Sequence, residues 1–244
     1  MQRSSFYSLY FLFVALIALT FGCEKEVIER PEPNAGSIQA IRTEVDLSVL
    51  EIETRKISRE QGMTLVWWVP VEYWQASFAQ NPLLTANQAK EAIEALKSYM
   101  TIVVLDGELN VFGEVTYRSE SKVRAVIQIK DENGTSYSPL SEGSISSYTQ
   151  RFLSMAKPTF TEAFGQMGQN TYIFVFPARD RTGQRIADPK KEGTFSVVLG
   201  NKELKWRLPL GSLLPPKICP VDGEKMNGAW KYCPWHGDKL LENR

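Results

Sequence analysis

The sequence predicts a mainly β protein, built as an antiparallel β-sandwich with one or two short helices. Runs rich in Val, Ile, Phe, Tyr, Trp and Thr recur along the chain, and such side chains fit a pleated sheet. Turn signals such as Asp106-Gly107, Asn133-Gly134 and Gly200-Asn201 separate these runs. Strong helical periodicity is scarce, and units that alternate strand, helix and strand are not seen, which favours antiparallel sheets.

The first predicted strand begins near residue 38. Apolar side chains recur there mostly at spacings of two, which is typical of a half-buried strand: Ala40, Val45, Leu47, Val49 and Ile52. Further strands are expected at 63–69, 101–105, 108–118, 122–130, 171–176, 194–199 and 203–208. Asp106-Gly107 and Gly200-Asn201 lie between neighbouring runs and predict tight hairpins.

Two segments have a helical pattern. Residues 86–100 place their apolar side chains on one helical face, and Thr85 and Gln88 have the spacing of a capping box. A weaker pattern covers residues 147–157 and is expected to end before Pro158.

The composition limits the functions open to this chain. Lys and Arg together number 28, as do Asp and Glu, so there is no basic excess for binding nucleic acid. The one histidine, His236, leaves residues 1–235 without the side chain most often used as a general base. Catalysis by a histidine-dependent triad in the body is therefore excluded, and carboxylate chemistry is the enzymatic alternative.

A cluster of aromatic residues bears on that alternative. Trp67, Trp68 and Trp74 lie close together in sequence with Glu72 among them. Exposed indole rings stack on sugar faces, so the cluster is a candidate platform for a glycan ligand. Tryptophan is also a common core residue, and neighbours on a strand point to opposite faces, so packing is the competing interpretation.

The N-terminus has the pattern of an export signal. Arg3 precedes an apolar stretch from Leu9 to Phe21, and Gly22 and Cys23 follow. This arrangement resembles the lipobox of bacterial lipoproteins, which implies cleavage before Cys23 and lipidation of its sulfur. An uncleaved membrane anchor and an unlipidated secreted protein remain alternatives. Residues 24–37 are polar and contain two prolines, which suits an extended tether.

Two short segments near the C-terminus repeat one pattern. Residues 219–223 read CPVDG and residues 233–237 read CPWHG. The repeat resembles the two knuckles of a zinc ribbon, which implies a structural zinc ion in a small hairpin with four ligands: Cys219, Asp222, Cys233 and His236. A disulfide between the two cysteines, or a hairpin that binds nothing, are the alternatives.

These patterns together divide the chain into four parts. They are a signal peptide (1–22), a lipidated Cys23 with its tether (23–37), a β-sandwich domain (38–217) and a zinc-ribbon-like tail (218–244). The predicted function is a non-enzymatic binding or structural role in a lipoprotein of the bacterial cell envelope, with an envelope protein or glycan as partner and no nucleic acid. A carboxylate enzyme acting on glycans and a redox protein using Cys219 and Cys233 are the alternatives.

Overall fold

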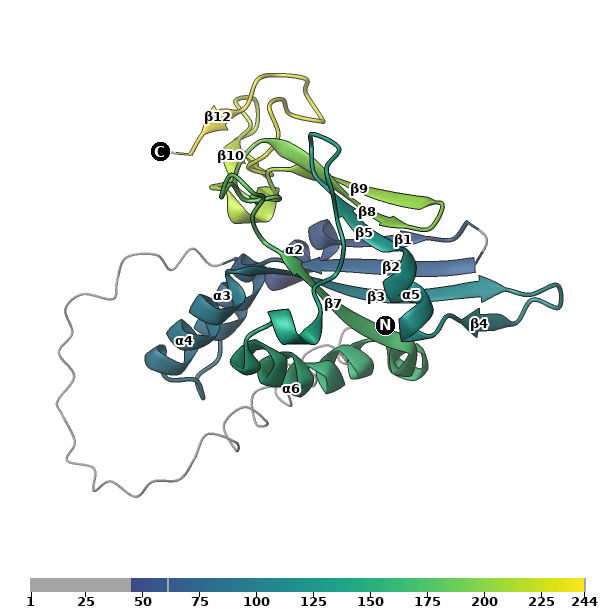
Figure 1. Ribbon diagram of the computed structural model, residues 1–244. Coiled ribbons are helices and arrows are strands. Elements are labelled where there is room, and N and C mark those ends of the chain that lie inside the picture. The colour runs from purple at the N-terminus through teal and green to yellow at the C-terminus, as the bar shows by residue number, and fades with distance from the viewer. Residues whose placement is uncertain (1–44, 61, 244) are drawn as a thin grey trace, which may run out of the picture.

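The computed structural model describes residues 45–60 and 62–243, which form three antiparallel sheets and several helices (Figure 1). The predicted signal peptide, Cys23 and the tether lie outside the described residues. None of the described helices has the length and apolar composition that a membrane-spanning segment requires.

The largest sheet is formed around one long strand, β3. Strand β3 pairs with β2 along one edge, and its other edge pairs first with β7 and then with β4. Strand β1 pairs with the free edge of β2. The strands of this sheet are β1 (Arg55–Ser58), β2 (Gly62–Val69), β3 (Tyr99–Leu109), β4 (Val115–Tyr117) and β7 (Thr171–Pro177).

A second sheet packs against one face of the first. Its strand order is β6-β5-β8-β9, and all of its pairs are antiparallel. Its strands are β5 (Ile127–Lys130), β6 (Ser136–Tyr137), β8 (Gly193–Leu199) and β9 (Lys202–Leu208). Phe195 and Trp206 of this sheet stack with their ring centres 5.0 Å apart and share one core with Trp68 of β2.

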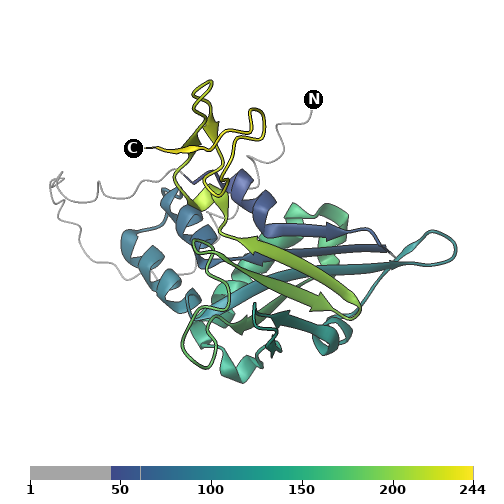
Figure 2. The same cartoon turned by 90° about the horizontal axis from the view of Figure 1, so that it is seen from above.

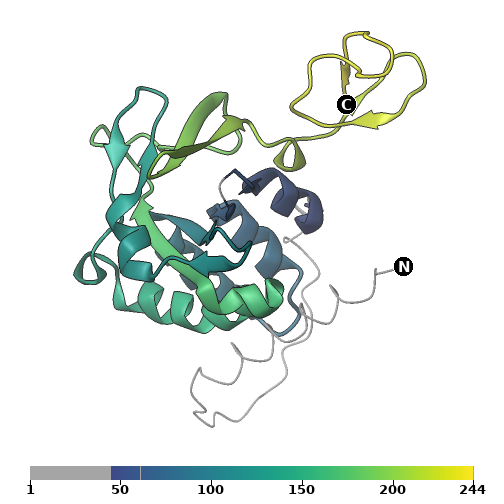
Figure 3. The same cartoon turned by 90° about the vertical axis from the view of Figure 1, so that its right-hand side faces the viewer.

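Helices cover the opposite face of the large sheet, so the body has three layers (Figures 1 and 3). Helices α3 (Val71–Ala79), α4 (Ala86–Leu96) and α6 (Ser147–Ala163) supply most of that covering layer. The antiparallel sheets predicted from the sequence are therefore present. Helices contribute far more than predicted, and two packed sheets alone do not describe the body.

Adjacent tryptophans on β2 show how the middle layer is buried on both sides. Trp67 points toward the helices and lies edge-on to Phe160 of α6, with ring centres 5.2 Å apart. Trp68 points toward the second sheet and contacts Phe195 at 4.7 Å between ring centres. This alternation follows from the twofold period of a strand. Because both faces are covered, β2 is apolar from Leu65 to Val69.

Several sequence-based boundaries are wrong. The first predicted strand begins outside the described residues, and its described part forms a helix from Leu47. Helix α2 (Leu47–Thr54) is capped at its N-terminus by Asp46, whose carboxylate accepts hydrogen bonds from the backbone N–H groups of Ser48 and Val49. Leu47 and Leu50 are buried, whereas Val49 and Ile52, which the alternation grouped with Leu47, are exposed. The cap at Asp46 and the burial of one face of the helix outweigh the alternation of apolar and polar residues.

The region from Asp106 to Lys130 also differs from the prediction. Asp106 and Gly107 continue β3 instead of forming a turn, and the hairpin turns at residues 110–114, where Gly113 has a φ of +81°. This hairpin extends beyond the body (Figure 2). The segment predicted as a strand at 122–130 forms α5 (Glu120–Val126) followed by β5.

The two predicted helices are found with changed ends. The capping box of Thr85 and Gln88 is formed, but α4 ends at Leu96, and Tyr99 begins β3. Helix α6 continues through Pro158, and Phe160 on its last turns is buried against the sheet. Short 3-10 turns complete the body at Glu142–Ser144, Gly165–Asn170 and Gly211–Leu213 (η3).

Candidate metal centre

The C-terminal tail is a small separate unit that projects from the body (Figure 3). Strand β10 (Lys217–Ile218) lies between β11 (Lys225–Met226) and β12 (Leu241–Glu242) in an antiparallel sheet. Its interior consists of four buried residues: Cys219, Met226, Cys233 and Leu240. A core this small contributes little stability, and units of this size normally need a metal ion or a disulfide.

Two turns with the same backbone geometry carry the predicted ligands. In the first, the N–H of Gly223 donates to the carbonyl of Cys219 at 2.9 Å, and in the second Gly237 donates to Cys233 at 2.9 Å. Both glycines have a φ of +76°, a conformation that other residues adopt at a cost. We call these turns the knuckles; each folds the chain back immediately after a cysteine.

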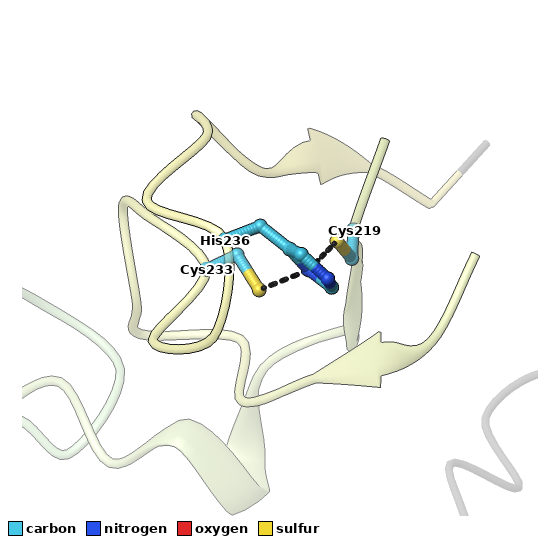
Figure 4. A group of neighbouring side chains, drawn as sticks. All are labelled: Cys219, Cys233 and His236. Carbon is cyan, nitrogen blue, oxygen red and sulfur yellow. Dashed lines mark hydrogen bonds between the residues drawn. The ribbon is translucent and has the colours of Figure 1, made fainter. Parts of the chain in front are cut away.

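The knuckles bring three predicted ligands together. The imidazole of His236 lies between the two sulfurs, with Nδ1 3.4 Å from Sγ of Cys219 and 3.5 Å from Sγ of Cys233 (Figure 4). The three donor atoms all lie within 4.8 Å of one another. Both cysteines are buried and are free thiols. This group of side chains can hold a metal ion.

The two distances from His236 Nδ1 to the sulfurs match a tetrahedral zinc site. Zinc binds cysteine sulfur at about 2.3 Å and histidine nitrogen at about 2.0–2.1 Å, so a tetrahedral angle separates the S and N atoms by about 3.5 Å. The two distances measured from His236 Nδ1, 3.4 and 3.5 Å, agree with that value.

Hydrogen bonding alone accounts less well for this arrangement. A neutral imidazole nitrogen either accepts one proton or donates one, so it serves a single good partner. Here one nitrogen, Nδ1 of His236, lies at nearly equal distances from two sulfurs. A cation at the centre of the group would satisfy all three atoms at once.

Asp222 is the fourth predicted ligand, and it lies at the margin of the group. Its Oδ2 atom is 3.7 Å from Nδ1 of His236. Its Oδ1 atom accepts a hydrogen bond from the backbone N–H of Glu224 at 3.0 Å. Asp222 does not belong to the set in which every donor atom lies within 4.8 Å of every other.

The electrostatic setting favours a thiolate at one cysteine. Burial acts to raise the pKa of Cys233, but hydrogen bonds to its sulfur from the backbone of His236 and Trp235 and from the His236 ring outweigh burial and lower it. The pKa of His236 is raised by its bond to Cys233 and by the charges of Asp222 and Asp238. Burial raises the pKa of Cys219. The thiolate is the form that binds metal.

A polar joint that the sequence did not reveal fixes the tail to the body. The carboxylate of Glu53, on α2, accepts hydrogen bonds from the backbone N–H groups of Gly211 and Ser212 at 3.0 Å each. It also accepts one from Nδ2 of Asn227, in the tail, at 3.1 Å. Because 174 residues separate Glu53 from Asn227, no local sequence pattern signals this contact.

The aromatic cluster has the packing role. Trp67, Trp68 and Trp74 are 4%, 1% and 2% exposed, so no ring face is free to stack on a sugar. Glu72 forms a salt bridge with Arg185, with Nη1 and Oε1 2.6 Å apart. These residues do not form the exposed aromatic cleft that the glycan-acting alternative requires.

Comparisons with protein-family models, with curated proteins and with solved structures found no match for this chain.

Proposed function

We propose that this protein is a zinc-binding, membrane-tethered protein of the bacterial cell envelope with a non-enzymatic binding or structural role. The observation that carries the metal-binding part is the convergence of Cys219, Cys233 and His236, with both sulfur–nitrogen distances close to those of a tetrahedral zinc site. Asp222, near the ring of His236, is the fourth ligand in this proposal.

The role of zinc in this proposal is structural. The tail has a four-residue interior, and a bound ion would add the stability that so little buried surface cannot supply. The two packed sheets then act as a sandwich-like frame that presents the tail. The exposed side chains of the tail, Tyr232 and Trp235 among them, are where a partner protein or glycan would bind.

Metal analysis of the full-length, untagged protein tests the proposal. We expect one zinc ion per chain, and we expect the substitutions Cys219→Ser, Cys233→Ser and His236→Ala each to abolish tight binding. Glu242→Gln is the matched control, because Glu242 lies on β12 of the tail and its carboxylate pairs with Lys217 instead of facing the three ligands. A chain that holds no zinc at micromolar free metal would overturn the metal-binding role.

Thiol titration separates zinc from the alternative of a disulfide. If zinc protects the two cysteines, a chelator exposes two reactive thiols without any reductant. If a disulfide joins them, only a reductant does so, and the redox alternative gains support.

The membrane tether rests on the sequence of residues 1–37 alone. Intact-mass spectrometry of the protein purified from membranes is the test. Loss of residues 1–22 together with acyl chains on Cys23 supports the tether, since several chains at about 0.8 kcal/mol per buried CH₂ hold a protein firmly in a bilayer. An unprocessed chain with a bare sulfur contradicts it.

A further inference from the structure

The candidate centre has two faces that differ in access to solvent. Cys219 and Cys233 are 1% and 2% exposed and close the inner face. The side chains of Asp222 and His236 are 38% and 34% exposed and form the outer face. The coordination position that Asp222 would fill therefore opens toward solvent.

Asp222 is poorly placed to close that position. The contact between its Oδ2 atom and Nδ1 of His236, 3.7 Å, is longer than the edge of about 3.3 Å that a zinc-bound oxygen and nitrogen would share in a tetrahedron. Its other oxygen is held by the backbone N–H of Glu224. To bind the ion at full strength, the carboxylate has to shift within the first knuckle.

The charge around the site selects the kind of donor that can replace Asp222. Two cysteine thiolates already balance the charge of a divalent ion. Asp222 lies within 3.7 Å of the His236 ring, and the charge of Asp238 also acts on that ring. A further anion would be repelled by these groups, whereas a neutral nitrogen donor adds no charge and suits zinc.

We propose that a metal ion in this centre keeps an exchangeable fourth position, which accepts a neutral imidazole from outside the chain. The inference rests on the metal-binding function proposed above. Cys219, Cys233 and His236 hold the ion, and Asp222 occupies the fourth position until an imidazole displaces it. The same chemistry is offered by free imidazole and by a histidine side chain on a partner protein.

Cobalt replaces zinc and makes the fourth position visible. The full-length, untagged protein loaded with Co²⁺ is titrated with imidazole while its absorption spectrum is recorded. We expect sulfur-to-cobalt charge-transfer bands before the titration, and a saturable change in the visible ligand-field bands with one imidazole per ion. Azide, a small anion, should bind more weakly than imidazole in the same assay.

Two variants locate the exchange at Asp222. Asp222→Asn removes the competing carboxylate and should strengthen imidazole binding by about tenfold, which corresponds to about 1.4 kcal/mol. Glu242→Gln removes an exposed carboxylate that pairs with Lys217, and it should shift imidazole affinity far less.

The outcomes separate the two proposals. Absence of charge-transfer bands would mean that the cysteines do not bind metal, and the proposed function would fail. Persistent charge-transfer bands with ligand-field bands that do not respond to imidazole would show a closed site, and this inference alone would fail. The inference would also fail if imidazole removed the cobalt without forming a complex of protein, cobalt and imidazole, or if azide bound more tightly than imidazole.

Discussion

Tyr137 shows how a partly buried, hydrogen-bonded hydroxyl makes stability depend on pH. Its hydroxyl donates to Oδ2 of Asp131 at 2.8 Å. Burial, together with this bond and the negative charge of Asp131, raises the pKa of Tyr137 to about 12. An unfolded tyrosine ionises near pH 10. The contribution of Tyr137 is therefore complete below pH 10 and is lost as the pH rises toward 12, because the unfolded state then releases the proton first.

The substitution Tyr137→Phe removes this dependence. We expect the wild type to be more stable than the variant below pH 10 and the gap to narrow between pH 10 and 12. Denaturant unfolding at a series of pH values measures the gap. Two stability curves that stay parallel across that window would contradict the assignment.

Gly237 tests the backbone geometry of the second knuckle. Its φ of +76° disfavours any residue with a Cβ by about 1–2 kcal/mol, and no atom lies within 4 Å of where that Cβ would stand. Gly237→Ala should therefore weaken zinc binding by about tenfold through strain alone. Gly143→Ala is the control, because Gly143 also has open space but lacks a positive φ. Unchanged zinc affinity in Gly237→Ala would refute the proposed role of the turn.

At the scale of elements, local signals predicted some structures well. The hairpin of β8 and β9 turns at Gly200-Asn201, as the sequence indicates, because Gly200 supplies the positive φ of 63° that a two-residue loop needs. The capping box of α4 is another local signal that the structure confirms. In both cases the residues that decide the conformation are neighbours in the chain.

Elements shaped by distant contacts were predicted poorly. The alternating apolar residues suggest a strand where α2 forms. The pattern is misleading because the sequence does not show which side chains are covered: in the folded core Leu50 is buried and Ile52 is exposed. The metal centre depends on both local sequence signals and distant contacts. The spacing of Cys219, Cys233 and His236 is a local signal, whereas the marginal position of Asp222 depends on how the two knuckles face each other.

At the joint, the carboxylate of Glu53 on α2 accepts a hydrogen bond from the side-chain amide of Asn227 in the tail. Asn227→Ala removes the hydrogen bond from Nδ2 of Asn227 to a carboxylate, and such bonds contribute about 1.5–3 kcal/mol. We expect the free energy of unfolding to fall by that amount in a chemical denaturation experiment. Asn87→Ala, at an exposed position of α4, should change it by no more than about 0.5 kcal/mol. Equal effects of the two substitutions would mean that the joint contributes nothing.

At the scale of the whole molecule, a buried ion pair connects the two large sheets. Nζ of Lys202, on β9, lies 3.2 Å from Oδ1 of Asp106, on β3. The side chain of Asp106 is fully buried, and Oδ1 also accepts a hydrogen bond from Thr64 on β2 at 2.6 Å. Nη1 of Arg118 is 3.3 Å from the other carboxylate oxygen. Charges this deep in a core are costly unless each has its partner.

Asp106→Asn should therefore destabilise the protein by about 3–5 kcal/mol, since it leaves Lys202 without its counter-ion. The double variant with Lys202→Met should recover part of that loss, because no unpaired ammonium remains at β9. Thermal or denaturant unfolding measures both. Glu94→Gln, which breaks an exposed ion pair with Lys97, should cost less than about 1 kcal/mol. A double variant less stable than Asp106→Asn would contradict this account.

The six tryptophans of the chain fall into two groups by location. Four are buried in the body, whereas Trp230 and Trp235 in the tail are 44% and 72% exposed. Dissolved acrylamide therefore reaches the indoles of the tail and is kept from those of the sheets. Fluorescence from one sample thus carries two separable signals. It can report whether the tail opens before the body when the ion is withdrawn, without attaching any label to the protein.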